Sequence, residues 1–313
     1  MNFIKKWYIY QKERFPILKY GIYIFAIVFS VFCYCNYIAP KIYINQIEIL
    51  KRTTNSIYPS KYTIDYFKVI PMFCVAFLQF LMVRIVDEFK DYEEDCKYRP
   101  YRPVPRGLIT LKELKILFII CIIIQFFITF ICKAGAFAPI TQIVLLLVLW
   151  GYFFIMSKGY FMKKFIDKHL LFEVFLDELM MPIMVMYLAS FVYDINLLMM
   201  VPFLIMSYLV SWIVEIARKV RCKEDEEKGV RTYTAVLGIK NATLLLSALE
   251  VVLACIQGII LKNYTISVIC LILAVILINI GFITKQSRKF AKLTELSANI
   301  YIFLVYFSMG LLL

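Results

Sequence analysis

Long apolar segments recur along the whole chain, and they constrain its fold more than any other feature of the sequence. A helix needs about 20 apolar residues to cross the hydrocarbon core of a bilayer. Nine segments come close to that length or exceed it, at about residues 18–39, 65–86, 114–132, 138–157, 169–192, 196–217, 241–261, 264–284 and 293–313. The sequence therefore predicts one all-α membrane domain over residues 1–313, a polytopic helical bundle with about nine transmembrane helices.

The composition agrees with a membrane protein and excludes other classes. Apolar residues make up 62% of the chain, whereas soluble globular domains contain about 45–50%. This surplus, with only 18% charged residues, also excludes intrinsic disorder. The first span is too long for a cleavable signal peptide and lacks a small-residue cleavage site, so we expect it to remain as a membrane helix.

The basic residues are distributed unevenly between the two sides of such a bundle. Of 35 Lys and Arg residues, 28 fall in the N-terminal segment and in the connections after the second, fourth, sixth and eighth spans. Cytoplasmic loops of membrane proteins carry this excess. We therefore expect a cytoplasmic N-terminus and a location in the cell membrane. Topology and anionic lipid explain the net charge of +13, so we expect a lipid bilayer and no nucleic acid as a partner.

Six carboxylates follow the second span, all between Asp87 and Asp95. If the helix continues through this segment, Asp87, Asp91 and Asp95 are spaced four residues apart and line one face. Stacked carboxylates repel one another, and oxygen ligands at a water-exposed rim suit Mg²⁺. The pattern predicts a magnesium site at these three residues. The alternative is a solvated helix end that is merely acidic.

A proline-rich turn with three arginines comes directly after the carboxylates, with the sequence RPYRPVPRG at residues 99–107. Its prolines end the helix and hold an extended turn. Guanidinium groups bind phosphate oxygens through paired N–H donors. Carboxylates beside Arg99, Arg102 and Arg106 therefore indicate a site for a metal-bridged polyphosphate.

A second charged cluster follows the sixth span. Residues 215–231 contain five carboxylates and six basic residues, with Gly229 near the end of the cluster and Thr232 three residues after it. The first cluster has the same outline, a membrane helix, an acidic stretch, a Gly and then a Thr. Because four helices separate the two clusters, they lie on the same membrane face. This weak internal repeat predicts two half-sites that face each other across one cavity.

Together these residues resemble the UbiA superfamily of intramembrane prenyltransferases. The first signature of that family is N-D-x-x-D-x-x-x-D followed by R-P-x-P-x-G. Asp91 and Asp95 match it directly, Asp87 stands where the family usually has Asn, and Arg102 begins the matching turn. The resemblance implies that these residues bind Mg²⁺ and the diphosphate of a prenyl donor, and that catalysis depends on the three aspartates.

Two further segments resemble patterns of the same family, one after the fourth helix and one in the second charged cluster. A Y-x-x-x-K pattern after the fourth helix is matched by Tyr160 and Lys164, so the resemblance implies diphosphate contacts for Lys164 and its neighbour Lys163. The second family signature, D-x-x-x-D ahead of a Gly and a Thr, is only partly matched. Asp225 has the expected spacing from the Gly, but Arg221 stands where the other Asp is expected.

This departure leaves two possibilities for the second half-site. Glu215 and Glu224 offer substitute carboxylates, so a second metal ion can be held by these residues with Asp225. Alternatively, fixed cations supply part of the charge of that metal. Arg218 and Arg221 would then contact the diphosphate.

Two acidic residues stand apart from both clusters. Asp177 and Glu178 lie deep in the fifth predicted span, just before Pro182. A carboxylate at membrane depth costs about 2.5–3.5 kcal/mol unless it has a partner. We expect the two residues to face a polar cavity, where one of them orients an acceptor or takes its proton. The alternative is a structural pair with a Lys or Tyr of a neighbouring helix.

The expected function is therefore that of an integral membrane prenyltransferase. It would use Mg²⁺ to ionise a prenyl diphosphate and transfer the isoprenyl group to an aromatic or other lipophilic acceptor, at a site open to the cytoplasm. A UbiA-type terpene cyclase, which needs no acceptor, is the main alternative. A transporter or a non-catalytic lipid-binding protein is less well supported, because the polar signatures lie at the rim rather than at the membrane midplane.

Overall fold

Helices form all the regular secondary structure in the part of the chain that the structure describes. The computed structural model describes residues 2–53, 64–132, 138–166, 168–192, 197–227, 229–261 and 264–312. The elements, in chain order, are α1 (Phe3–Arg14), α2 (Ile17–Thr53), η1 (Tyr66–Lys68), α3 (Val69–Lys90), α4 (Tyr92–Tyr98), α5 (Leu111–Ile131), α6 (Ala138–Ser157), η2 (Gly159–Phe161), α7 (Lys163–Ile166), α8 (Leu170–Glu178), α9 (Met180–Ala189), α10 (Leu197–Arg218), η3 (Lys223–Asp225), α11 (Tyr233–Ile260), α12 (Thr265–Lys285) and α13 (Arg288–Leu311).

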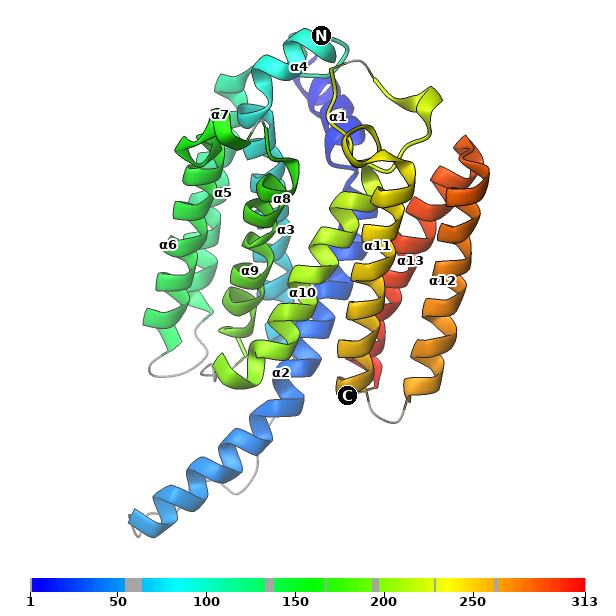
Figure 1. The fold of residues 1–313 in the computed structure, drawn as a ribbon. Helices are drawn as coiled ribbons and strands as arrows, with labels where there is room; N and C mark the ends of the chain where they lie inside the picture. The colour runs from blue at the N-terminus through cyan, green and yellow to red at the C-terminus, as the bar shows by residue number, and fades with distance from the viewer. Residues whose placement is uncertain are drawn as a thin grey trace.

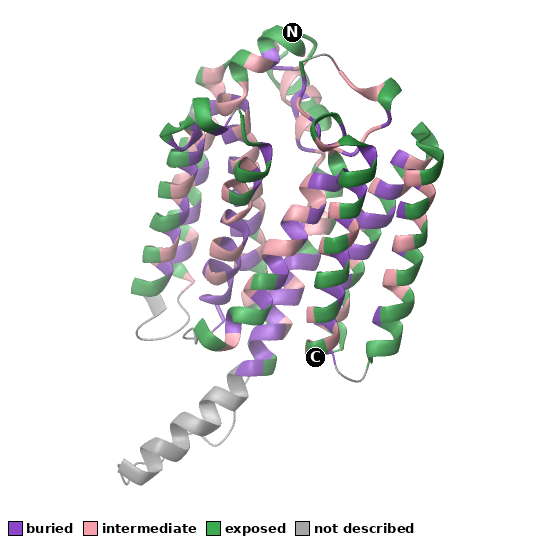
Figure 2. Cartoon of the chain, in the orientation of Figure 1, coloured by how far each residue is buried: buried purple, intermediate pink, exposed green. Residues whose placement is uncertain are grey.

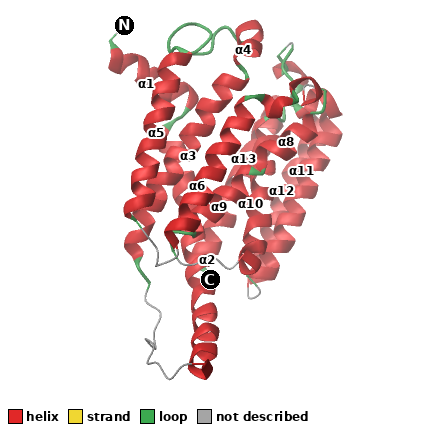
Figure 3. Ribbon diagram, turned by 90° about the vertical axis from the view of Figure 1, so that its left-hand side faces the viewer, coloured by secondary structure: helices red, strands yellow, loops and turns green. Residues whose placement is uncertain are grey.

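The long helices run alongside one another, with the connections at the two ends of the bundle (Figure 3). The central helix α10 packs against α8, α9, α11 and α13, while α2 packs against α3 and α13. The N-terminus, α1, α4 and α7 lie at one end of the bundle, and the C-terminus lies at the other (Figure 1). Both charged clusters therefore come to the end that holds the N-terminus.

The outer surface of the bundle is apolar, as a surrounding of hydrocarbon requires. Green, exposed segments follow the outer faces of α5 and α12 (Figure 2). These faces expose large apolar side chains, among them Ile123, Phe127, Leu273 and Leu277. Soluble monomers rarely expose apolar patches of this extent. The protein is a multi-pass membrane protein.

Eight of the expected spans are helices long and apolar enough to cross a membrane in the described part of the chain. They are Ile17–Ile38, Tyr66–Lys90, Leu111–Ile131, Ile140–Ser157, Leu197–Arg218, Tyr233–Ile260, Thr265–Lys285 and Arg288–Leu311. The fifth expected span instead forms two short helices, α8 and α9, which meet at Leu179. Pro182 explains the break, because it has no N–H to donate and its ring crowds the carbonyl of Glu178, four residues earlier. The all-α membrane bundle is confirmed, with this one interrupted segment.

The expectation of one continuous helix through residues 87–95 was wrong. Helix α3 ends at Lys90 and α4 begins at Tyr92, with Asp91 between them at φ −94° and ψ 3°. The interruption places Glu93, Glu94 and Asp95 in the first turn of α4. The N-terminal end of a helix dipole stabilises carboxylates, whereas the end of one longer helix would destabilise them.

Close packing joins the end of α4 to the last part of the second charged cluster. Gly229 has φ +80°, and a Cβ atom at this residue would lie 2.2 Å from the ring of Tyr98, which is the last residue of α4. Both the backbone conformation and the approach of the ring therefore require Gly at this position.

We expect Gly229→Ala to destabilise the protein through the contact with Tyr98. The positive φ alone costs an L-residue about 1–2 kcal/mol, and the collision with the ring adds to that. Thermal unfolding of the detergent-solubilised protein measures the effect. In a Tyr98→Ala background the collision is absent, so the double variant should lose less stability than the sum of the two single variants. Additive losses would contradict this contact.

Candidate active site

A partly open cavity of about 310 Å³ lies among α3, α8 and α10, close to the end of the bundle that holds the N-terminus. Charged side chains make up much of its wall. The carboxylates are Asp87, Asp91, Glu94, Glu173, Asp177, Glu178 and Glu215, and the cations are Arg84, Lys90, Arg99, Arg102, Arg218, Lys219, Arg221 and Arg231. Apolar and aromatic side chains line the rest, including Tyr20, Tyr23, Phe80, Met180, Met181 and Val210. The cavity thus joins a charged region to an apolar one.

Asp87 and Asp91 bring the first cluster to the cavity. Asp87 accepts from Arg84 at 3.2 Å, whereas no ion pair with Asp91 occurs among the described residues. Desolvation, and then the nearby carboxylate of Asp87, raise the pKa of Asp91 to about 7. The surrounding protein therefore disfavours the anionic form of the Asp91 carboxyl, and a bound cation would stabilise that form.

Asp95 lies behind the cavity wall rather than in it. Its carboxylate is 2% exposed, 2.5 Å from Nη1 of Arg102 and 3.4 Å from Nη1 of Arg99. Both arginines line the cavity, but Asp95 does not. The structure therefore separates the three aspartates into two at the cavity and one that positions arginines.

Lys90 joins the fifth span to α3. Its Nζ lies 2.8 Å from Oδ2 of Asp177 and 2.9 Å from Oε1 of Glu173. The hydroxyl of Tyr160 also donates to Asp177, at 2.7 Å. Asp177 therefore has the structural partners, a Lys and a Tyr, that were the alternative expectation. Glu178 lines the cavity beside it.

The second cluster contributes mainly cations to the cavity. Glu215 is neutralised by two residues of its own helix end, since it pairs with Arg218 and lies 2.6 Å from Nζ of Lys219. Arg221 also lines the cavity. Two expected metal ligands lie elsewhere, because Glu224 is exposed and Asp225 is held by Arg288 of α13 with an Nε–Oδ2 distance of 2.9 Å.

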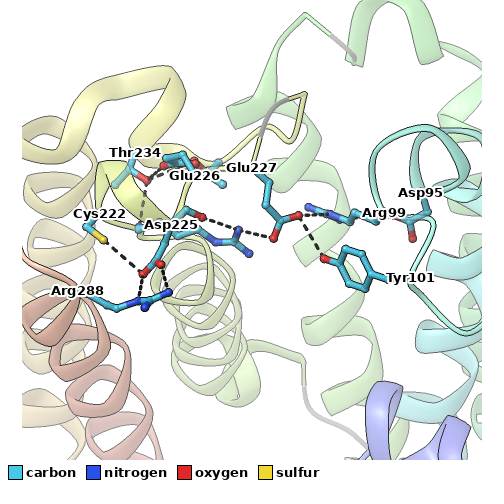
Figure 4. Close-up of polar contacts among 11 residues, drawn as sticks. Asp95, Arg99, Tyr101, Cys222, Asp225, Glu226, Glu227, Thr234 and Arg288 are labelled. Carbon is cyan, nitrogen blue, oxygen red and sulfur yellow. Dashed lines mark hydrogen bonds and ion pairs between the residues drawn. The ribbon is translucent and has the colours of Figure 1, made fainter.

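The carboxylate of Asp225 contacts the guanidinium of Arg288 (Figure 4). The hydrogen bond from Arg288 holds the pKa of the Asp225 carboxyl below its usual value. Cys222 lies at 3.4 Å from the same carboxylate. Neither Glu224 nor Asp225 is among the residues that line the cavity.

Glu227 connects the second cluster to the turn that follows the first cluster (Figure 4). Its carboxylate lies 3.4 Å from Nε of Arg99 and 3.1 Å from Nη1 of Arg221, and it accepts from the hydroxyl of Tyr101 at 3.3 Å. A single carboxylate thus holds one arginine from each half of the cavity. Nothing in the spacing of Glu227 distinguished it from its acidic neighbours in the sequence.

Of the other expected diphosphate contacts, Arg106 and Lys164 do not line the cavity. Arg106 lies 2.9 Å from the carboxylate of Glu13 in α1. Lys164 is exposed in α7. Lys163 begins α7, but its side chain lies outside the described residues. The cavity also includes four cations that were not among the expected diphosphate contacts, namely Arg84, Lys90, Lys219 and Arg231.

Glu173 is a further cavity residue that the sequence analysis missed. It pairs with Lys90 and lies 3.3 Å from Nη2 of Arg231. Its spacing of four residues before Asp177 was the available signal, because residues four apart share a helix face.

The donor set fits Mg²⁺ at the wall formed by α3. Among the described residues, no three His, Cys, Asp or Glu side chains form a group that could hold a metal ion by themselves. Mg²⁺ commonly uses one or two carboxylates and completes its shell with water and substrate phosphates. Asp87 and Asp91 suit such a site, in which a phosphate-bearing substrate supplies the remaining ligands.

The fold and the cavity define a helical membrane protein with a charged site beside an apolar pocket. The model of the UbiA prenyltransferase family matches residues 58–305, so the chain belongs to that family. No curated protein sequence matches it.

Two solved structures share the fold. One is described as digeranylgeranylglyceryl phosphate synthase in membranes, with a TM-score of 0.60, 17% identity, and coverage of 99% of this chain and 100% of that one. The other is the apo structure of a UbiA homolog from Aeropyrum pernix K1, with a TM-score of 0.61, 13% identity, and coverage of 90% of this chain and 95% of that one. At these identities the likeness concerns the fold.

Removal of the Lys90 charge should destabilise the protein. We expect Lys90→Met to cost about 3 kcal/mol, because Glu173 and Asp177 would then remain largely buried without their shared cation. Chemical denaturation in detergent measures the loss. Lys112→Met, at an exposed position of α5, removes the same charge and serves as a control with little effect. Equal losses in the two variants would show that the Lys90 pairs contribute nothing specific.

Proposed function

We propose that this protein is an integral membrane prenyltransferase that transfers an isoprenyl group from a prenyl diphosphate to an aromatic or other lipophilic acceptor. One observation carries the proposal. Carboxylates on α3 and cations on α10 line the same cavity as a set of apolar and aromatic side chains. A prenyl diphosphate has the matching chemistry, with a highly charged head and an apolar chain.

The cations of the cavity would stabilise the leaving diphosphate. When the bond between the allylic carbon and the diphosphate oxygen breaks, both bond electrons leave with the diphosphate. Arg99 and Arg102 donate to developing negative charge of this kind, and Asp95 keeps them in position. Mg²⁺ at Asp87 and Asp91 would add positive charge at the same oxygens.

The apolar part of the cavity would protect the allylic cation. Tyr20, Tyr23 and Phe80 line it, and aromatic faces attract cations. Exclusion of water by these residues would prevent hydrolysis of the cation. An acceptor that attacks the cation must then lose a proton, and Glu178 is the carboxylate we propose to receive it.

We also propose that the cavity faces the cytoplasm, in the cell membrane. The end of the bundle with the N-terminus carries both clusters (Figure 1). The N-terminal segment and the connections after the second, fourth, sixth and eighth expected spans hold 28 of the 35 basic residues, an excess typical of cytoplasmic loops.

Product analysis tests the reaction. The purified protein would be incubated with Mg²⁺ and labelled prenyl diphosphates of several lengths, with and without a membrane lipid extract. We expect diphosphate release and a prenylated product, identified by mass, only when the extract is present. A cyclic hydrocarbon formed from the donor alone would instead identify a terpene cyclase. Donor binding without diphosphate release would exclude both reactions.

Two aspartate variants test the assignment of the site. We expect Asp91→Ala and Asp95→Ala to abolish turnover, the first through loss of the cation site and the second through release of Arg99 and Arg102. Glu93→Ala removes an exposed carboxylate of the same segment and should retain turnover. Near-normal activity of either aspartate variant would refute the role proposed for that residue.

A further inference from the structure

The two charged walls of the cavity differ in the groups they offer a diphosphate. On the wall formed by α3, Asp87 and Asp91 both face the cavity. Asp87 accepts from Arg84 at 3.2 Å, whereas Asp91 has no ion pair among the described residues. On the wall formed by α10, the carboxylate of Glu215 already contacts Arg218 and Lys219. The first wall therefore has carboxylate oxygens available for a cation, and the second does not.

Of the four other carboxylates of the second cluster, Glu224 is exposed and lies outside the cavity lining, and the other three contact neighbouring residues. Asp225 contacts Arg288 and lies outside the cavity lining. Glu226 accepts from the hydroxyl groups of Thr232 and Thr234 at 2.7 and 2.6 Å. Glu227 contacts Arg99 and Arg221. Ligation of a metal ion by any of them would require the loss of these contacts.

Cations occupy the corresponding part of the second wall. Arg218, Lys219 and Arg221 all line the cavity, and they outnumber the single carboxylate of Glu215. Arg221 stands at the position where the resemblance to the second UbiA signature implies an Asp. Its backbone N–H donates to Thr234 at 3.1 Å, and its guanidinium donates to the carbonyl of Asp225 at 3.3 Å, so the residue is fixed in the loop.

We propose that the wall formed by α10 binds the diphosphate directly through Arg218, Lys219 and Arg221, without a metal ion, and that the cavity takes one divalent cation per diphosphate, at Asp87 and Asp91. This inference rests on the proposed function, since it concerns the same diphosphate. The guanidinium of Arg221 presents N–H donors that suit phosphate oxygens. Glu227 holds Arg221 in the absence of an anion, and the diphosphate takes its place on that guanidinium.

Equilibrium dialysis of the full chain in detergent tests the inference, with inorganic pyrophosphate and Mn²⁺ as probes. Bound pyrophosphate and bound Mn²⁺ are both counted, with the dialysate as the reference for complexes free in solution. We expect one Mn²⁺ per bound pyrophosphate in the unsubstituted protein. Two Mn²⁺ per bound pyrophosphate would overturn the inference alone. A protein that binds no pyrophosphate would overturn both the inference and the proposed function.

Substitutions test separately the binding of pyrophosphate at one wall and the binding of Mn²⁺ at the other. Arg221→Ala should weaken pyrophosphate binding by about tenfold or more and leave the ratio of Mn²⁺ to pyrophosphate unchanged. Asp91→Ala should lower that ratio, whereas Asp225→Asn should alter neither the ratio nor the affinity. A lower ratio in Asp225→Asn would show that the second cluster does hold a metal ion, and would overturn the inference.

Two further variants distinguish a direct contact of Arg221 with pyrophosphate from the effect of losing any positive charge in the loop. Lys223→Ala removes a positive charge from an exposed position of the same loop, outside the cavity lining, and should change the affinity less than twofold. Arg221→Lys keeps the charge and should recover part of the affinity lost in Arg221→Ala. An Arg221→Ala protein that binds pyrophosphate as tightly as the unsubstituted protein would overturn the inference.

Discussion

Lys90 makes the contact on which the geometry of the cavity depends. Pro182 interrupts the fifth span, so α8 lacks the support of a continuous helix and carries Glu173 and Asp177 into the interior. Charges at this depth are costly unless each has a partner. Lys90 is 2.8–2.9 Å from both carboxylates and therefore holds α8 against the end of α3. Because Lys90 lies between Asp87 and Asp91 in the chain, the same contact places these two aspartates at the cavity.

One physical rule explains the contacts of the other charged residues around the cavity: a buried charge needs a partner or a ligand. Asp95 satisfies it with Arg99 and Arg102, and Glu215 satisfies it with residues of its own helix end. Asp91 has no such partner among the described residues. An unequal distribution of partners therefore distinguishes a wall suited to a cation from a wall suited to an anion. The proposed binding of a diphosphate with one metal ion uses this difference directly.

The sequence predicted much of the fold and part of the site. The apolar segments predicted the helical membrane bundle because span length is set by bilayer thickness. The two clusters predicted the region of the cavity, since motifs four helices apart share a membrane face. Spacing alone did not separate Asp95 from Asp87 and Asp91, because the chain bends at Asp91. Nor did it show that Asp225 contacts Arg288, a residue 63 positions later in the chain.

Composition and local periodicity are enough to specify the class of fold, the membrane as its solvent, and the charged segments from which a site could form. The reason is that bilayer thickness sets the length of an apolar span and helix geometry sets its periodicity, both of which act over short stretches of chain. Which charges face the cavity and which neutralise one another depends on how the helices pack. Ion pairing depends on distances of a few ångströms between side chains that are far apart in the chain. Lys90 with Asp177 and Asp225 with Arg288 are contacts of this kind, and together they decide what the cavity can bind.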